Sequence, residues 1–187
     1  MFTRSRLSRI PEEQLNAEQH EVLNEILRGP RGNLDGPFLA WIHSPKFADH
    51  AQRLGAFCRY DTSLETRLSE LAILTTAALW QSQAEWMIHE PIGLKSGLTE
   101  EVLSQIRNGE SPRFLKTDEG LIYRFVTDLY TRRRVGDDLY CEAVELLGEA
   151  GVVELTGILG YYSLVAMTLN VFAVAPDDKC SELPFPA

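Results

Sequence analysis

The chain has 187 residues, of which 44% are hydrophobic and 24% are charged, and its formal net charge is −9. These values are typical of one soluble globular domain with a sizeable core. The negative charge argues against a nucleic-acid partner, because phosphates would be repelled. Three widely spaced cysteines without a Cys-x-x-Cys, at Cys58, Cys141 and Cys180, fit a reducing compartment. No apolar core follows the arginines of MFTRSRLSRIPEEQ, so this start is not a secretory signal and we expect a cytoplasmic protein.

Helical spacing of apolar residues runs through the first third of the chain. After an arm over residues 1–11, this spacing predicts a helix over 16–28, which GPRGN at 29–33 ends. A second helix is expected from Pro45 to about residue 57, with Ser44 as its cap.

A strong helix is predicted to begin at Thr62-Ser63-Leu64-Glu65, which has the pattern of a capping box. Glu70 lies in the middle of its apolar run, where a charge needs a partner or a raised pKa. Two interpretations are open. Glu70 either forms a salt bridge with Arg67 or is a buried proton carrier near His89.

The next helix, from about 83 to 95, carries a cluster of ionisable and aromatic side chains. Ser82, Glu85 and His89 are spaced three and four residues apart, which places them on one helix face, and Trp86 flanks that face. A carboxyl and an imidazole beside bulky rings form a plausible acid/base pair. The same pattern is also typical of a partly exposed face with one ion pair. Pro91 is expected to kink this helix or to break it briefly.

Further helices are predicted from Thr99, from Thr117, from Asp137 and over 151–174. The last contains 21 uncharged residues from Leu155 to Ala175, long enough to cross a membrane. We reject that interpretation, because its glycines and tyrosines make it moderately polar and the chain has no other such segment. A helix apolar all round is instead expected to be buried inside the domain or between subunits.

Three stretches together resemble the carboxymuconolactone decarboxylase family. They are RLSELAIL with Arg67 and Glu70, AEWMIHEPIGLKSGL with Glu85, Trp86 and His89, and ELTGILGYYSLVAMTLN at 154–170. The likeness covers about residues 64–174 and is weaker in the HSP turn at 43–45.

This resemblance implies the alkylhydroperoxidase-like fold, an all-α bundle of about eight helices that assembles as trimers or hexamers. It divides the chain into an N-terminal helical extension over 1–60, a decarboxylase-like domain over 61–176 and a tail over 177–187. Redox members of the superfamily carry a Glu, then a Cys-x-x-Cys, then a His one helical turn later. On that pattern Glu70 is the distal acid and His89 the histidine, while Ser82 and Glu85 occupy the cysteine positions. The chain therefore lacks the dithiol.

The resemblance implies a cofactor-free decarboxylase or related lyase acting on a small, anionic lactone or carboxylic acid. We expect no metal; His43 and His50 are interpreted as surface or turn histidines because their neighbours lack metal-binding spacing. The alternative is a non-redox binding or scaffolding protein of the same fold, and a peroxidase is less favoured. The expected catalytic residues are Glu85, His89 and Glu70. The expected substrate-binding residues are Ser82, Trp86 and Trp80.

Overall fold

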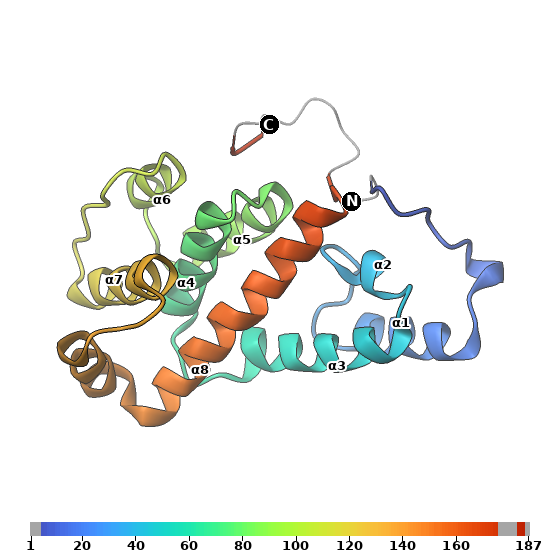
Figure 1. Cartoon of the computed structure of the whole chain (residues 1–187), viewed down its shortest axis with the longest axis horizontal. Coiled ribbons are helices and arrows are strands. Elements are labelled where there is room, and N and C mark those ends of the chain that lie inside the picture. Colours follow the sequence, from blue (N-terminus) through green and yellow to red (C-terminus); the bar gives the residue numbers. More distant parts are fainter. Residues whose placement is uncertain (1–4, 176–182, 186–187) are drawn as a thin grey trace.

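Eight α-helices and no β-strand make up the part of the chain that the computed structural model describes, residues 5–175 and 183–185 (Figure 1). The all-α prediction is therefore confirmed for these residues. The predicted tail falls largely outside them, as do the first residues of the arm and Cys180. The helices are α1 (Ala17–Arg28), α2 (Phe38–Trp41), α3 (Pro45–Ala56), α4 (Thr66–Leu79), α5 (Gln83–Ser96), α6 (Glu100–Arg107), α7 (Thr117–Arg132) and α8 (Asp137–Val171).

The central helix is α4, which lies against α5, α6, α7 and α8. Every residue from Arg67 to Ala77 is buried. Its threonines fit this apolar setting because their hydroxyls donate to the carbonyl four residues earlier, Thr75 to Leu71 at 2.7 Å and Thr76 to Ala72 at 2.9 Å. Leu71 is fully buried, so truncating it to Ala would cost about 2–5 kcal/mol.

The capping predictions had mixed outcomes. α1 has a capping box, in which Asn16 and Gln19 each accept from the other's backbone N–H at 2.9 Å, and Thr99 caps α6. The capping box predicted for α4 is wrong, because that helix begins at Thr66 without a side-chain cap. Ser63 instead donates from its backbone N–H and its hydroxyl to the Glu154 carboxylate, at 2.7 and 2.6 Å, which ties the start of α4 to α8. The expected Ser44 cap is also absent, since its side chain makes no capping bond.

α5 continues through Pro91 without the short break that we considered. The proline lies on the exposed side of the helix, where a missing backbone hydrogen bond is least costly. The helix ends at Gly97, whose φ of 105° is a left-handed conformation that glycine adopts without strain.

Gly148, with φ 72° and ψ 166°, interrupts α8 and separates the two helical segments that the sequence predicted. The second segment buries one face and exposes another, which includes Val153 at 71%, Met167 at 42% and Val171 at 58% exposure. Burial on all sides within the chain is therefore wrong, whereas burial between subunits stays a prediction. α8 is long and apolar enough to span a membrane, but 56% of its apolar window is buried inside the chain, as in the core helix of a soluble protein.

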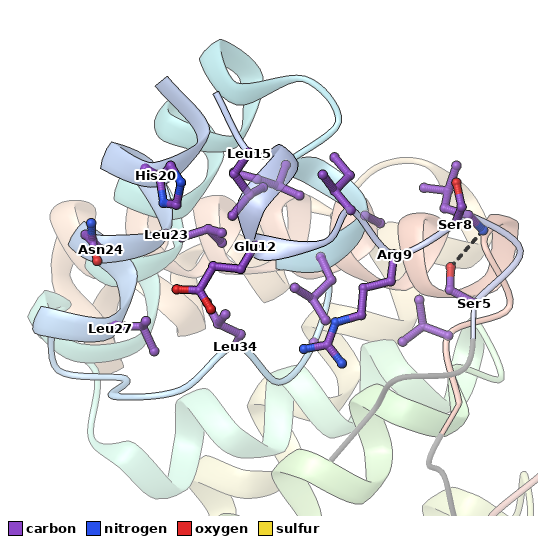
Figure 2. A pocket seen from close by; sticks show the side chains of 17 residues that line it. Ser5, Ser8, Arg9, Glu12, Leu15, His20, Leu23, Asn24, Leu27 and Leu34 are labelled. Carbon is purple, nitrogen blue, oxygen red and sulfur yellow. Dashed lines mark hydrogen bonds between the residues drawn. The ribbon is translucent and has the colours of Figure 1, made fainter. Parts of the chain in front are cut away.

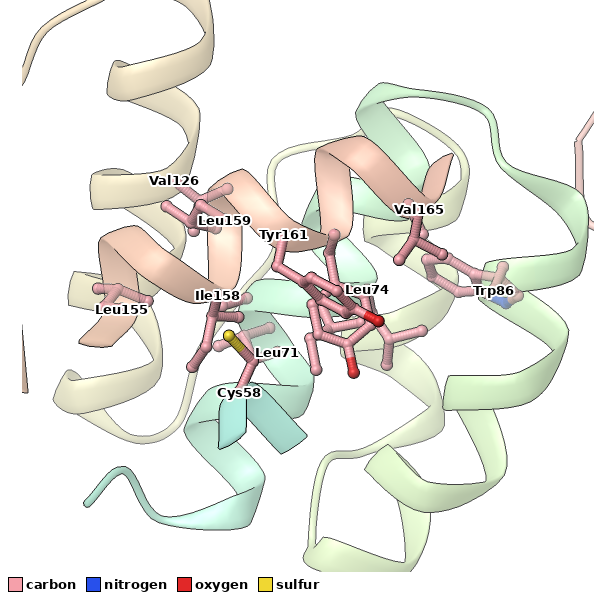
Figure 3. Close-up of a cluster of buried hydrophobic side chains, with 14 of the residues drawn as sticks. Cys58, Leu71, Leu74, Trp86, Val126, Leu155, Ile158, Leu159, Tyr161 and Val165 are labelled. Atoms are coloured by element: carbon pink, nitrogen blue, oxygen red, sulfur yellow. The ribbon is translucent and has the colours of Figure 1, made fainter. Parts of the chain in front are cut away.

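One continuous hydrophobic cluster joins the N-terminal helices to the rest of the bundle. It extends from Val22 on α1 to Phe185 near the C-terminus, and includes the residues around Cys58, Leu71 and Tyr161 (Figure 3). In Figure 1, α8 crosses the molecule between α1–α3 on one side and α4–α7 on the other. A π-helical turn at Phe57–Asp61 links α3 to the segment before α4.

Candidate active site

Glu70 of α4 and His89 of α5 form a buried pair. Nδ1 of His89 lies 2.8 Å from Oε2 of Glu70, and the two residues are only 4% and 3% exposed. Since a carboxylate can only accept, the hydrogen bond places a proton on Nδ1. This leaves Nε2 as the ring nitrogen available for chemistry. The structure therefore agrees with the second interpretation of Glu70, in which this residue is buried near His89.

The alternative salt bridge between Glu70 and Arg67 is wrong, because Arg67 faces another set of acids. Its guanidinium donates to Asp118 and Glu119 at 2.7 Å each, and more weakly to Glu65 at 3.2 Å. The hydrogen bonds from Arg67 lower the pKa of Asp118. Arg67 is 5% exposed, so this network neutralises a buried charge at the start of α4.

Glu85 is a buried carboxyl without a hydrogen-bond partner. It is 1% exposed, and neither of its oxygens is paired with another described residue. Burial raises its pKa well above the ordinary value, and the nearby Ser82 hydroxyl opposes this only in part. That hydroxyl is itself buried and lies close to Glu85 without forming a hydrogen bond of good geometry.

Two opposing effects act on the charge of Glu85. Its place in the first turn of α5 favours the anion by about 0.3–1 kcal/mol. An unpaired buried charge costs several kcal/mol, so the burial effect is larger. Burial therefore favours the neutral carboxylic acid, which is the form of Glu85 that is able to donate a proton.

Glu85 and His89 both line a small cavity between α5, α8 and the loop before α2. Its volume of about 20 Å³ is enough for one water molecule. The remaining lining residues come from the loop before α2, the π-helical turn, α5 and α8, namely Arg31, Asp35, Gly36, Pro37, Arg59, Ile88, Tyr161, Tyr162, Val165 and Leu169.

Two adjacent tyrosines of α8 also line this cavity. The Tyr162 ring meets His89 edge to face, with centroids 5.0 Å apart, and Tyr161 meets Tyr162 in the same way at 5.2 Å. Both hydroxyls are buried, and neither is hydrogen-bonded to another described residue. Burial raises the pKa of Tyr161 to about 12 and also raises that of Tyr162, so both stay protonated donors.

Sequence reasoning missed these tyrosines as site residues. Their signal is a Tyr-Tyr pair within an otherwise apolar helix, because buried hydroxyls usually need a partner. It also missed Arg31 and Arg59, which the sequence places in a turn and a helix end without any distinguishing pattern. Neither arginine forms an ion pair with another described residue.

The two predicted tryptophans lie away from this cavity. Trp86 is fully buried and packs edge to face against Phe185, with ring centroids 5.5 Å apart. Trp80 follows the last turn of α4, and its carbonyl accepts a hydrogen bond of 2.8 Å from Asn170. The structure thus brings together Glu70, Glu85 and His89, with Ser82 next to Glu85, but neither tryptophan lines the cavity.

A larger hollow of about 260 Å³ lies between the N-terminal segment and α1 (Figure 2). Six leucines are among its 17 lining residues, together with Arg9, Glu12 and His20. It contains none of the predicted catalytic residues, and it meets the small cavity only at Gly36. Within residues 5–175 and 183–185, no group of three or more His, Cys, Asp or Glu side chains is arranged to hold a metal ion. Glu85 and His89 therefore lie at the small cavity and not at this hollow.

The sequence matches no protein-family model, and no curated protein matches it. Its structure is similar to a crystal structure described as an alkylhydroperoxidase AhpD core, an uncharacterized peroxidase-related protein from Ralstonia eutropha JMP134. The TM-score is 0.74 at 16% sequence identity, over 96% of this chain and 95% of the other. At this identity the likeness shows the fold. The chain therefore has the alkylhydroperoxidase-like helical fold that the resemblance predicted.

Proposed function

We propose that this protein is a cofactor-free acid/base enzyme, a lyase of the carboxymuconolactone decarboxylase type that acts on a small carboxylic acid or lactone in the cytoplasm. The observation that carries the proposal is Glu85, a buried carboxyl that has no hydrogen-bond partner among the described residues and lies in the same cavity as His89. Buried titratable groups with shifted pKa values in a cavity are typical of catalytic sites. Glu70 fits the proposal because it fixes the orientation of the His89 ring.

In such a reaction the bond between the departing carboxylate and its carbon breaks, and CO2 leaves. The electron pair moves into a conjugated carbonyl and forms an enolate. The Tyr162 hydroxyl is a buried donor that would stabilise the enolate oxygen. Glu85 would then give its proton to carbon, and His89 would carry the replacement proton through Nε2. The net change replaces a carboxylate by hydrogen and consumes one proton.

Two observations favour this chemistry over a dithiol peroxidase. Ser82 and Glu85 stand where redox members of the superfamily carry their cysteines, and neither forms a disulfide. Cys58 is buried near Tyr161, and burial raises the pKa of its thiol to about 11, which disfavours the reactive thiolate.

The size of the cavity favours the alternative of a non-redox binding or scaffolding protein. Because the cavity holds only one water molecule, a substrate must displace part of its wall. Gly36 lines both this cavity and the larger hollow, so the loop that contains it forms the wall between them. Turnover by the purified protein separates the two functions.

The test is a screen of small carboxylic acids and lactones for CO2 release, followed by Glu85→Gln and His89→Gln. Each variant should lose about 10²–10⁴-fold in turnover while its melting temperature stays near that of the wild type. The double variant should be little worse than the worse single one, since groups that act as a unit are non-additive. Glu90→Gln, on the same helix outside the cavity, is the matched control. Full activity in both site variants would contradict the proposal.

A further inference from the structure

Three buried polar atoms that make no hydrogen bond of good geometry lie on the side of the cavity formed by the loop before α2, where the Arg31 guanidinium is close enough to the Tyr161 hydroxyl to lower its pKa slightly against the larger effect of burial. They are Nε and Nη2 of Arg31 and the hydroxyl of Tyr161, none of which is hydrogen-bonded to another described residue. A buried donor left unpaired costs about 1–3 kcal/mol, and more for a charged group. Burying these groups costs less when a bound molecule accepts their hydrogen bonds.

The packing around Arg31 and Tyr161 holds both groups in place. A β-carbon on Gly55 would collide with the Tyr161 hydroxyl and would also meet Nη2 of Arg31, so both groups lie against this glycine. The Arg31 guanidinium stacks over the Phe38 ring at 4.9 Å. An arginine that is supported on one face by an aromatic ring presents its planar set of donors edge-on.

The charges that line the cavity favour an anion. Arg31 and Arg59 are positive, and Asp35 is the one ordinary carboxylate there, without an ion pair to either arginine among the described residues. Burial raises the pKa of Glu85 and so favours its neutral form, and His89 is paired with Glu70. Although the net charge of the chain is −9, this local excess of positive charge attracts an anion to the cavity.

We propose that Arg31 and Tyr161 form a carboxylate-binding subsite, which anchors a carboxylate that the substrate keeps during the reaction. The inference rests on the proposed function, because it places the reacting part of the ligand against Glu85 and His89. Arg31 matches the two oxygens of a carboxylate with two N–H groups, and Tyr161 adds a third hydrogen bond. The departing carboxylate lies elsewhere, since an ion pair to Arg31 would stabilise it against loss as CO2.

The test measures binding and needs no turnover. The probes are 4-fluorobenzoate and its neutral isostere 4-fluorobenzamide, each titrated against the full chain with ¹⁹F NMR at up to roughly 10 mM, a range that detects millimolar Kd values. We expect the wild type to bind the carboxylate at least about 10-fold more tightly than the amide. Arg31→Gln should remove this preference, and Tyr161→Phe should weaken carboxylate binding by a few fold. Arg28→Gln, an exposed arginine three residues earlier with the same change in charge, is the matched control and should bind as the wild type does.

Equal binding of the two probes, no binding of the carboxylate, or a preference that survives in Arg31→Gln would overturn the subsite. The same titration separates this result from a failure of the proposed function. Glu85→Gln and His89→Gln should keep the carboxylate preference, because neither residue belongs to the subsite. If the preference depends on Arg31 while no CO2 release is found, the subsite stands and the lyase proposal fails.

Discussion

The Glu70 carboxylate on α4 accepts a hydrogen bond of 2.8 Å from Nδ1 of His89 on α5, although the two residues are 19 positions apart. Both side chains lie in the protein interior, where such a bond is stronger than in water. The bond fixes the plane of the imidazole and the nitrogen that carries its proton. Through Glu70, the central helix thus orients the ring of a residue on its neighbour.

Glu70→Gln should therefore change the state of His89 without removing it. The glutamine amide can donate to Nδ1, which would move the ring proton to Nε2. We expect a loss of turnover of up to about 10⁴-fold, the size of effect seen when an orienting carboxylate is replaced by its amide. The ¹⁵N chemical shifts of His89 report the tautomer directly. An unchanged tautomer combined with full turnover would show that Glu70 has only a packing role.

Glu85 should make stability depend on pH. Because its pKa is raised in the folded state, the folded protein binds this proton more tightly than the unfolded chain does. The free energy of unfolding then falls as pH rises from the ordinary carboxyl pKa towards the raised folded value. Thermal unfolding from about pH 5 to about pH 8 should show a steeper decline for the wild type than for Glu85→Gln. Glu101→Gln, at an exposed position, should keep the wild-type slope. Parallel curves for wild type and Glu85→Gln would argue against a neutral Glu85.

Local patterns predicted the helices and the common face of Glu85 and His89, because a helical period of 3.6 places residues four apart on one side. The boundary errors have local physical causes. Ser63 was read as a capping residue, but its hydroxyl donates to Glu154, 91 positions later. A side chain that finds a distant partner is no longer available for its own helix end.

The remainder of the site depends on contacts between distant segments. In the sequence, Tyr161 and Tyr162 indicate only that an apolar helix is moderately polar. Their place beside His89 follows from the packing of α8 against α5. Arg31 lies in a turn whose glycines and proline predicted only the end of a helix. No local spacing indicates that this turn folds back onto the cavity. The pairing of Glu70 with His89 was suggested by the family resemblance, since spacing alone left Arg67 as the simpler partner.

Arg67 should matter for stability more than any exposed arginine. Replacing it with Met keeps much of its packing but leaves Glu119, which is 5% exposed, without its 2.7 Å partner. Breaking a buried ion pair in this way costs about 3–5 kcal/mol. Arg53→Met is the matched control: Arg53 also contacts two acids, but its side chain is 59% exposed, so solvent screens these ion pairs and the loss should be much smaller. Urea unfolding of both variants gives the comparison, and similar losses would mean that the Arg67 network is not specially stabilising.

We expect the exposed face of α8 to be buried in an interface with a second copy of the chain. Val153, Gly157, Gly160, Leu164, Met167 and Val171 recur every three or four residues, which places them on one side of the helix without a charge.

We expect a homo-oligomer, a trimer or hexamer, with interfaces above about 2,000 Å². Val153→Asp with Met167→Asp should dissociate it, because each carboxylate would be buried unpaired. Light scattering after size-exclusion chromatography at micromolar concentration measures the mass. Leu115→Asp, in the loop before α7 and 93% exposed, should leave the assembly intact. A wild-type protein that is monomeric and fully soluble at this concentration would refute the interface.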